Sequence, residues 1–376
     1  MDERGFSLKR PQYMLLLAGF VHGSHLLFGF IEKSSGHDYL IVLLAGFLMS
    51  LPVLLVLTAL SKSYPQADLV QILEIVFGRF IGRFIAVLYI IFFLILLSFN
   101  LWDISNFYVG SFMPETPNAV FIVITALTCA YAVKKGMGSV AKICLFTIAF
   151  GLFVPVMTSL LLLGKMDFSN FLPVMERPAQ TYIMPLATLI TLPFGEAVAL
   201  LLVLPALSDK KKLIRYTAGG MAITTLIFFI VGMRNTAVLG ASGEVYANLA
   251  FQSIRMIDIG EFLTRIEIVI ALVLTTASFI KLSVLYYACV KSASSLLSLK
   301  NHNSIILPLG SIAVALATLV FKSPVYHSDW ARTYAATFSL PFAVVIPVIT
   351  LLVSLLKKKK EKQGSSAASS QIKNRT

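Results

Sequence analysis

Ten stretches of this 376-residue chain are each apolar over roughly the length of a membrane crossing. A transmembrane helix needs about 20 predominantly apolar residues. The stretches are residues 11–31, 39–60, 83–107, 118–133, 139–163, 182–206, 214–236, 262–290, 303–321 and 335–356. Hydrophobic residues make up 57% of the chain and charged residues 13%, about half the charged share of a soluble domain. The sequence therefore predicts an all-α integral membrane protein with ten transmembrane helices.

Lysine and arginine are unevenly spread between the loops, and their distribution predicts how the chain lies in the bilayer. Dense clusters precede the first span and follow the second, fourth, sixth and tenth, for example at Lys210 to Lys212. Cytoplasmic loops carry an excess of these residues. Both termini are therefore predicted to be cytoplasmic, with residues 1–10 as the N-terminal segment. The net charge of +13 lies in short clusters rather than on one basic face, which favours a lipid bilayer over nucleic acid as the partner.

Two spans contain residues that interrupt a helix near its middle. The first reads LLLAGFVHGSHLLFG, with Gly23 and Ser24 at its centre, and the sixth reads TLPFGEAV, with Pro193 and Gly195. Proline removes a backbone donor, and glycine lets the chain bend. Lipid cannot satisfy the freed backbone groups, so an interrupted span must be buried in protein or line a cavity. The alternative is that these residues are simply common in membrane helices.

The two interrupted spans each begin a set of five. Residues 11–163 hold the first five spans, residues 182–356 hold the second five, and residues 164–181 form an extracytoplasmic loop between them. Because five is odd, the two halves run in opposite senses across the membrane. Paired interruptions in inverted halves indicate a transporter-type binding site near the midplane. The expected fold is a 5+5 inverted repeat with broken helices one and six.

A carboxylate, Glu196, directly follows the break in the sixth span. An acid at the centre of a membrane helix costs at least about 2.5–3.5 kcal/mol unless it faces a partner or a cavity. Three roles are open: the carboxylate meets the ammonium of a ligand, carries a proton, or holds two helices together.

The eighth span carries three hydroxyls and a cation, at Thr275, Thr276, Ser278 and Lys281. The hydroxyls can help to bind a cation beside the broken part of helix one, or Lys281 can act as a fixed charge in place of sodium. Alternatively, the lysine extends to the cytoplasmic surface and the hydroxyls bond back to their own helix. No metal-ligand spacing, nucleotide-binding loop or hydrolase motif is present in the sequence, so no enzyme, metal site or cofactor is predicted.

Three segments outside the spans carry their own predictions. Residues 61–84 are amphipathic and are expected to lie at the membrane interface. Residues 240–260 are expected to form a surface helix. Residues 357–376 are basic and low in complexity, and they are predicted to be a disordered cytoplasmic tail.

Four stretches together resemble a known family. They are YPQADLVQILEIVFGRFIG (64–82), NFLPVMERP (170–178), LPFGEAVALLLVLPALSDKKK (192–212) and LTRIEIV (263–269). The chain resembles, over nearly its whole length, the B-subunit of nutrient germinant receptors from endospore-forming bacteria. That permease-like subunit is a branch of the amino acid–polyamine–organocation transporter superfamily.

The resemblance implies a fold of the leucine-transporter type in the spore inner membrane. It also implies a subunit that senses a small nutrient, such as an amino acid, and signals to a larger membrane subunit and a lipoprotein. The alternative is an amino acid permease coupled to protons or sodium. Carried over from the family, the ligand-binding residues are Gly23, Ser24, Leu96, Asn100, Leu192, Phe194, Gly195 and Glu196. The family's helix-one motif is usually small and apolar, whereas His22 and His25 flank the break here, which leaves the ligand's identity open.

Overall fold

The computed structural model describes residues 7–246, 248–257, 266–299, 301–321 and 323–373, with side chains as far as residue 359. The helices of the first half are α1 (Arg10–His22), α2 (His25–Ser35), α3 (Tyr39–Ser63), α4 (Leu69–Phe77), α5 (Arg79–Ser111), α6 (Asn118–Lys135) and α7 (Met137–Leu161). Those of the second half are α8 (Gln180–Thr191), α9 (Leu213–Leu239), α10 (Leu249–Arg255), α11 (Ile266–Leu296), α12 (Asn303–Leu319), α13 (Pro324–Thr333), α14 (Ala335–Leu340) and α15 (Ile346–Lys373). Short 3₁₀ and π turns join several of them.

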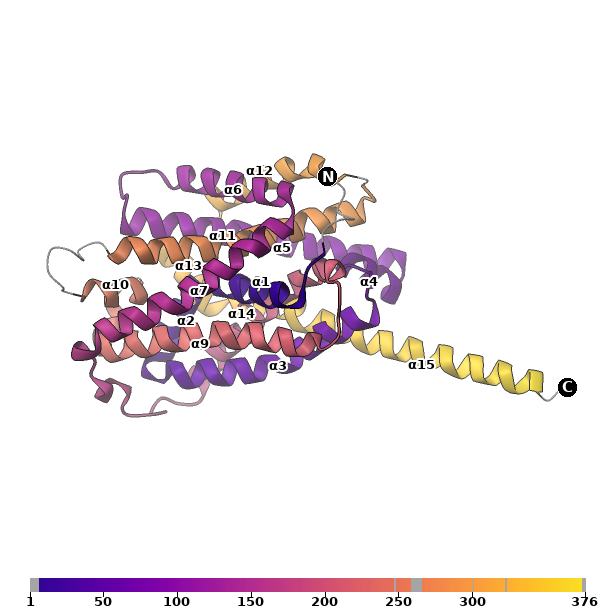
Figure 1. The fold of residues 1–376 in the computed structure, drawn as a ribbon, viewed down its shortest axis with the longest axis horizontal. Coiled ribbons are helices and arrows are strands. Elements are labelled where there is room, and N and C mark those ends of the chain that lie inside the picture. Colours follow the sequence, from indigo (N-terminus) through magenta and orange to yellow (C-terminus); the bar gives the residue numbers. More distant parts are fainter. Residues whose placement is uncertain (1–6, 247, 258–265, 300, 322, 374–376) are drawn as a thin grey trace.

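Within the described residues, helices occupy each of the predicted spans, and the long helices lie side by side in one bundle (Figure 1). Residues 262–265, at the start of the eighth predicted span, lie outside the described residues. In the part of the chain that is described, eight helices are long and apolar enough to cross a membrane, or nine if the bent pair α12 and α13 is one span. α1 has 13 residues and α2 has 11, so each is shorter than a crossing and only together do they match the first span. The total of ten crossings, and the division into segments at residues 163 and 182, stay predictions.

Both predicted interruptions are present. The first span breaks at Gly23 and Ser24, between α1 and α2. The sixth breaks where α8 ends at Thr191, and the chain resumes as a 3₁₀ helix over Gly195–Leu202. α1 packs against α7, α9 and α11, which places the first break in the interior of the bundle.

The connecting segments lie at the two ends of the bundle. α4 occupies residues 69–77 of the predicted interfacial segment, toward the right of Figure 1, and α10 lies toward the left. α10 is the helix expected within residues 240–260, of which 247 and 258–260 lie outside the described residues.

The C-terminal tail differs from the prediction of disorder. α15 continues without interruption from the last span to Lys373 and projects from the bundle as the yellow helix of Figure 1. Lysine, glutamate, glutamine and alanine are favourable helix residues, and extending an existing helix avoids the cost of nucleation. The polar composition of residues 357–373 therefore did not show that their backbone is helical.

Candidate functional site

Glycine at the break of the first span allows that break to lie directly against α11. A Cβ atom at Gly23 would stand 2.6 Å from the carbonyl oxygen of Ala277 and would also collide with the Cβ of Lys281. Any larger residue would therefore separate α1 and α2 from α11. The sequence pattern that predicted the bend thus also provides close packing at this point.

The break of the sixth span is packed in a similar way. A Cβ atom at Gly195 would stand 2.7 Å from the Cβ of Ala343, in the π turn Pro341–Val345, and 2.6 Å from the carbonyl oxygen of Ile190. Helix six therefore touches the last span at its break.

A buried ion pair connects the two breaks. The Nζ atom of Lys281 lies 2.8 Å from Oε2 of Glu196 and donates a hydrogen bond of 2.8 Å to the hydroxyl of Ser24. The side chains of Lys281 and Glu196 are only 2% and 1% exposed. The carboxylate thus faces an ammonium of its own chain. Of the three roles open from the sequence, this geometry supports the one in which Glu196 holds helices together.

The two threonines of the eighth span bond back to their own helix rather than to this ion pair. Thr275 and Thr276 donate to the carbonyl oxygens of Ala271 and Leu272, one turn earlier in α11, at 2.6 and 3.0 Å. Thr275 also meets the hydroxyl of Tyr108, whereas Ser278 is buried in the same helix. Lys281 is turned inward rather than toward the surface, so its role as a fixed charge stays a proposal that the geometry favours over a surface lysine.

The other residues carried over from the family lie within the bundle. Leu96, Leu192 and Phe194 are buried, and Phe194 meets the ring of Phe28 edge-on. The amide of Asn100 donates to the carbonyl oxygen of Leu96 at 2.8 Å. Direct contact of these residues with a ligand stays a prediction.

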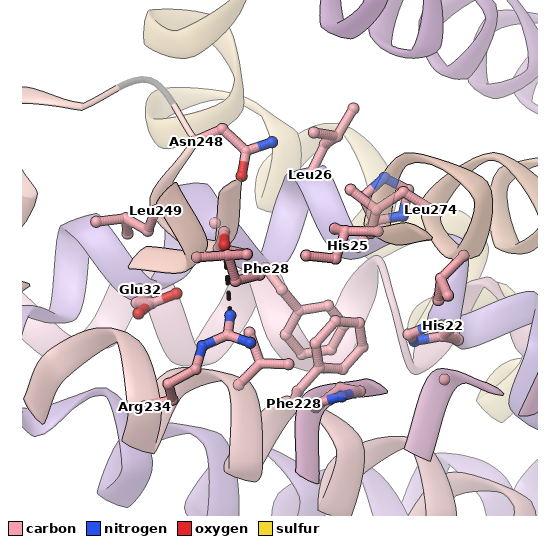
Figure 2. Close-up of a pocket in the computed structure, with 18 of the residues that line it drawn as sticks. His22, His25, Leu26, Phe28, Glu32, Phe228, Arg234, Asn248, Leu249 and Leu274 are labelled. Carbon is pink, nitrogen blue, oxygen red and sulfur yellow. Dashed lines mark hydrogen bonds between the residues drawn. The ribbon is translucent and has the colours of Figure 1, made fainter. Parts of the chain in front are cut away.

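A cavity borders the break of the first span at His22 and His25, and we call it the inner cavity (Figure 2). Its volume is about 70 Å³, and its walls come from α1, α2, α3, α7, α9, α10 and α11. A buried water needs about 10–15 Å³, so the space matches about five waters or one small molecule. The lining includes His22, His25, Phe28, Glu32, Phe228 and Arg234.

The middle of the inner cavity is apolar and aromatic. The rings of Phe28 and Phe228 are stacked with centroids 3.6 Å apart, and the ring of His22 lies 5.5 Å from that of Phe228. Leu26 and Leu274 add aliphatic surface. Figure 2 shows the two phenyl rings between the histidines on one side and Arg234 on the other.

A hydrogen-bonded network closes the end of the inner cavity away from the histidines. The Asn235 side chain accepts from Arg234 at 2.9 Å and donates to the carboxylate of Glu32 at 3.2 Å. Ser253 on α10 also donates to Asn235, at 2.8 Å, and Arg234 donates to Thr158 on α7, at 2.7 Å. Four helices are thereby joined at one point.

Beyond this network lies a second space, the outer cavity, of about 350 Å³. It is lined by polar residues that include Lys33, His37, Ser169 and Asn170, and it shares Glu32 with the inner cavity. The network around Asn235 therefore lies between the two cavities, and Glu32 lines both of them.

Sequence reasoning missed most of the inner cavity. Arg234 falls near the end of span 214–236, and Glu32 falls just beyond the first span. A charged residue at the end of a transmembrane span usually faces water or lipid headgroups, so neither position indicated a buried site. The histidines were noticed only as a departure from the family's pattern.

The cytoplasmic side of the bundle, as assigned from the loop charges, is closed by several contacts. The N-terminal segment pairs with the loop after the sixth span, where the amide of Leu8 donates to the carbonyl oxygen of Ala206 at 2.8 Å. Lys210 in that loop donates to the hydroxyl of Ser61 at 2.9 Å and to the carbonyl oxygen of Pro65 at 2.6 Å. Partial burial lowers the pKa of Lys210 to about 8.

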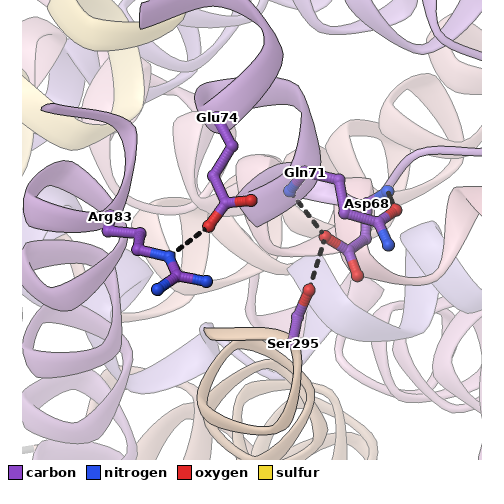
Figure 3. Close-up of polar contacts among 5 residues, drawn as sticks. All are labelled: Asp68, Gln71, Glu74, Arg83 and Ser295. Atoms are coloured by element: carbon purple, nitrogen blue, oxygen red, sulfur yellow. Dashed lines mark hydrogen bonds and ion pairs between the residues drawn. The ribbon is translucent and has the colours of Figure 1, made fainter. Parts of the chain in front are cut away.

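Helix α4 is fixed beside this closure (Figure 3). Asp68 caps α4 by accepting from the amide of Gln71 at 3.0 Å, and Ser295 of α11 donates to the same carboxylate at 3.4 Å. Glu74 pairs with Arg83 of α5 at 2.7 Å. The short helix is thus tied to both of its long neighbours.

Comparison with known proteins identifies the family. A family described as "Spore germination protein" matches residues 7–325. The chain belongs to this spore germination protein family. Among curated members from Bacillus subtilis (strain 168), spore germination protein KB is 24% identical over 95% of this chain and 96% of its own length. Spore germination protein B2 is 24% identical, covering 85% of each chain.

Solved structures similar to this spore germination protein are transporters of the leucine-transporter fold. A nucleobase-cation-symport-1 family transporter, Mhp1, with bromovinylhydantoin bound, superposes with a TM-score of 0.70 at 13% identity, over 93% of this chain and 78% of its own. MhsT in complex with L-phenylalanine gives a TM-score of 0.68 at 14% identity, over 93% of this chain and 99% of its own. The predicted fold and the resemblance to germinant-receptor B-subunits are confirmed. The protein is a multi-pass membrane protein of this family.

Proposed function

We propose that the protein is the ligand-sensing subunit of a spore germinant receptor in the spore inner membrane. A small nutrient binds beside the break of helix one and changes the balance between two conformations. Partner subunits, a larger membrane subunit and a lipoprotein, receive that change. The supporting observation is the position of the inner cavity, which lies against a helix break in a fold shared with transporters that bind small molecules.

The mechanism depends on the contacts made by α1 and α2, the two helices that meet at the break of the first span. α1 and α2 meet at Gly23 and Ser24, and Ser24 is bonded to Lys281. A ligand in the inner cavity touches α2, α9 and α10 and favours the conformation in which those helices enclose it. Ligand binding shifts an equilibrium only by the difference in affinity for its two states. Movement of α2 relative to α1 would thereby change the position of Ser24 and of Lys281, which is bonded to Ser24 and ion-paired with Glu196.

The experiment compares spores with and without this gene in a nutrient panel, scored by germination rate. Loss of the response to one nutrient on deletion, restored by the intact gene together with its partner subunits, is the expected result. An unchanged response across a panel of amino acids would contradict the sensing role.

An amino acid permease coupled to protons or sodium is the second candidate, favoured by the transporter fold. Vesicles containing the purified protein separate the two functions. Accumulation of a labelled amino acid driven by a proton or sodium gradient would support the permease. Saturable binding without accumulation would support the sensor. Lys281 already places a positive charge at the break of helix one, so we expect binding to be independent of sodium.

A further inference from the structure

The inner cavity contains buried polar groups that the protein itself leaves without partners. Among the described residues, neither ring nitrogen of His22 and neither ring nitrogen of His25 has a hydrogen-bond partner. The ring of His25 approaches the carbonyl oxygen of His22, but the two lack hydrogen-bond geometry. His22 is 3% exposed. Leaving a buried polar group without a partner is unfavourable, so these imidazoles are suited to bonding a guest.

The opposite end of the cavity carries one positive and one negative group held apart. Arg234 and Glu32 are joined through the amide of Asn235 rather than by a direct ion pair. The Nε atom of Arg234 is buried and has no partner among the described residues. A guanidinium nitrogen is suited to a carboxylate, and a carboxylate is suited to an ammonium. This end therefore matches the two charged groups of a zwitterion.

Resting on the proposed function, we propose that the inner cavity selects an α-amino acid with a small polar side chain. The carboxylate and ammonium of the ligand face Arg234 and Glu32, and its side chain passes the stacked Phe28 and Phe228 toward the histidines. Each neutral imidazole offers one donor and one acceptor, so a hydroxyl or carboxamide side chain is satisfied there. An aliphatic side chain of the same shape would leave the imidazoles unpaired.

The test uses two pairs of nearly isosteric amino acids, threonine with valine and asparagine with leucine. Binding of each labelled amino acid is measured on the full-length protein in lipid vesicles. We expect the polar member of at least one pair to bind more tightly by roughly 10- to 100-fold, the range for leaving buried polar groups unpaired. Absence of a polar preference in both pairs, whether binding is equal or the aliphatic member binds more tightly, would overturn the proposal, and so would no binding of any of the four.

Variants then assign the preference to the histidines. His22→Leu should reduce the ratio of polar to aliphatic binding to near one, whereas His22→Asn, which keeps a donor and an acceptor, should retain a preference. Gly151→Ala narrows the space beside His22, because the added Cβ would lie 3.0 Å from Nε2, and should weaken binding of all four probes. His302→Leu, at the start of α12 outside the cavity lining, is the matched control and should leave the ratio unchanged. Membrane yield of each variant reports folding.

The outcomes separate this proposal from the function on which it rests. If deletion of the gene abolishes a nutrient response but His22→Leu leaves the ratio of polar to aliphatic binding unchanged, the sensing role stands and the selectivity proposal fails. If the vesicles show the polar preference and spores without the gene germinate normally, the sensing role fails instead.

Discussion

Breaking the ion pair between Lys281 and Glu196 tests whether the two helix breaks depend on each other. At an N–O distance of 2.8 Å and an effective dielectric constant of about 20, the attraction is about 6 kcal/mol. Removing both charges from water costs several kcal/mol per ion, so the net contribution of the pair is small. Removing one partner is different, because the remaining charge stays buried without compensation.

We therefore expect Glu196→Gln or Lys281→Met alone to lower the free energy of unfolding by about 3–5 kcal/mol. The double variant should recover most of this loss, because neither charge remains. The total stability of a domain is about 5–15 kcal/mol, so each single variant should also accumulate poorly in the membrane. Denaturation in mixed micelles, followed by circular dichroism, gives the three free energies.

The pair of Arg10 with Asp209 provides a control on the surface. Its N–O distance is 2.9 Å, close to that of the buried pair, but its side chains are 33% and 36% exposed. Arg10→Ala should cost no more than about 1 kcal/mol. Should Glu196→Gln prove as mild as this control, with no recovery in the double variant, the carboxylate would not be a helix-joining group, and a ligand-binding role for it would regain support.

Three further predictions follow from single contacts. Gly23→Ala should lower the free energy of unfolding by about 1–3 kcal/mol through its collision with Ala277. Gly29→Ala, with no atom within 4 Å of the new Cβ, should instead leave the free energy of unfolding unchanged or raise it by up to about 1 kcal/mol, because alanine favours a helix interior more than glycine does. Asn235→Leu should lower the free energy of unfolding by about 1–3 kcal/mol, because it leaves the guanidinium of Arg234 and the carboxylate of Glu32 without their shared partner. An unchanged unfolding curve would refute this. Lys210 has a pKa of about 8 in the folded protein, below its value of 10.5 when exposed. As the pH rises from about 8 to 10.5, the folded state therefore loses this proton before the unfolded state does, and the free energy of unfolding should rise relative to that of Lys210→Met. Parallel pH profiles of stability for the two proteins would contradict this.

The sequence predicted the backbone of this protein better than its side-chain contacts. The breaks at Gly23 and Gly195 were predictable because glycine and proline act on their own local backbone. The pairing of Glu196 with Lys281 was not, because it depends on how two spans far apart in the sequence turn toward each other. The tail beyond residue 357 was mispredicted for a different reason: its composition is polar, yet its residues extend an existing helix readily.

The inner cavity could not be predicted for a third reason. It is lined by residues that look ordinary one at a time: a glutamate and an arginine at span ends, and two phenylalanines in apolar runs. Only the packing of α2, α9 and α10 brings Glu32, Arg234 and the ring pair around one space. The two histidines were the sole hint in the sequence, because they stand where the family usually has small apolar residues.

The polar groups at the two ends of the inner cavity indicate how much binding free energy a ligand must contribute to signal. Moving a two-state equilibrium from 1:99 to 99:1 takes about 5.5 kcal/mol of differential binding. One hydrogen bond to His22 contributes only about 0.5–1.5 kcal/mol net. A ligand that made only one such bond, to a histidine, would therefore fail to switch the protein. In the proposed mechanism, a molecule that joins both ends of the inner cavity would hold α1 and α2 in one relative position. Because Ser24 at that junction is bonded to Lys281, the same constraint reaches Glu196 and the break of helix six.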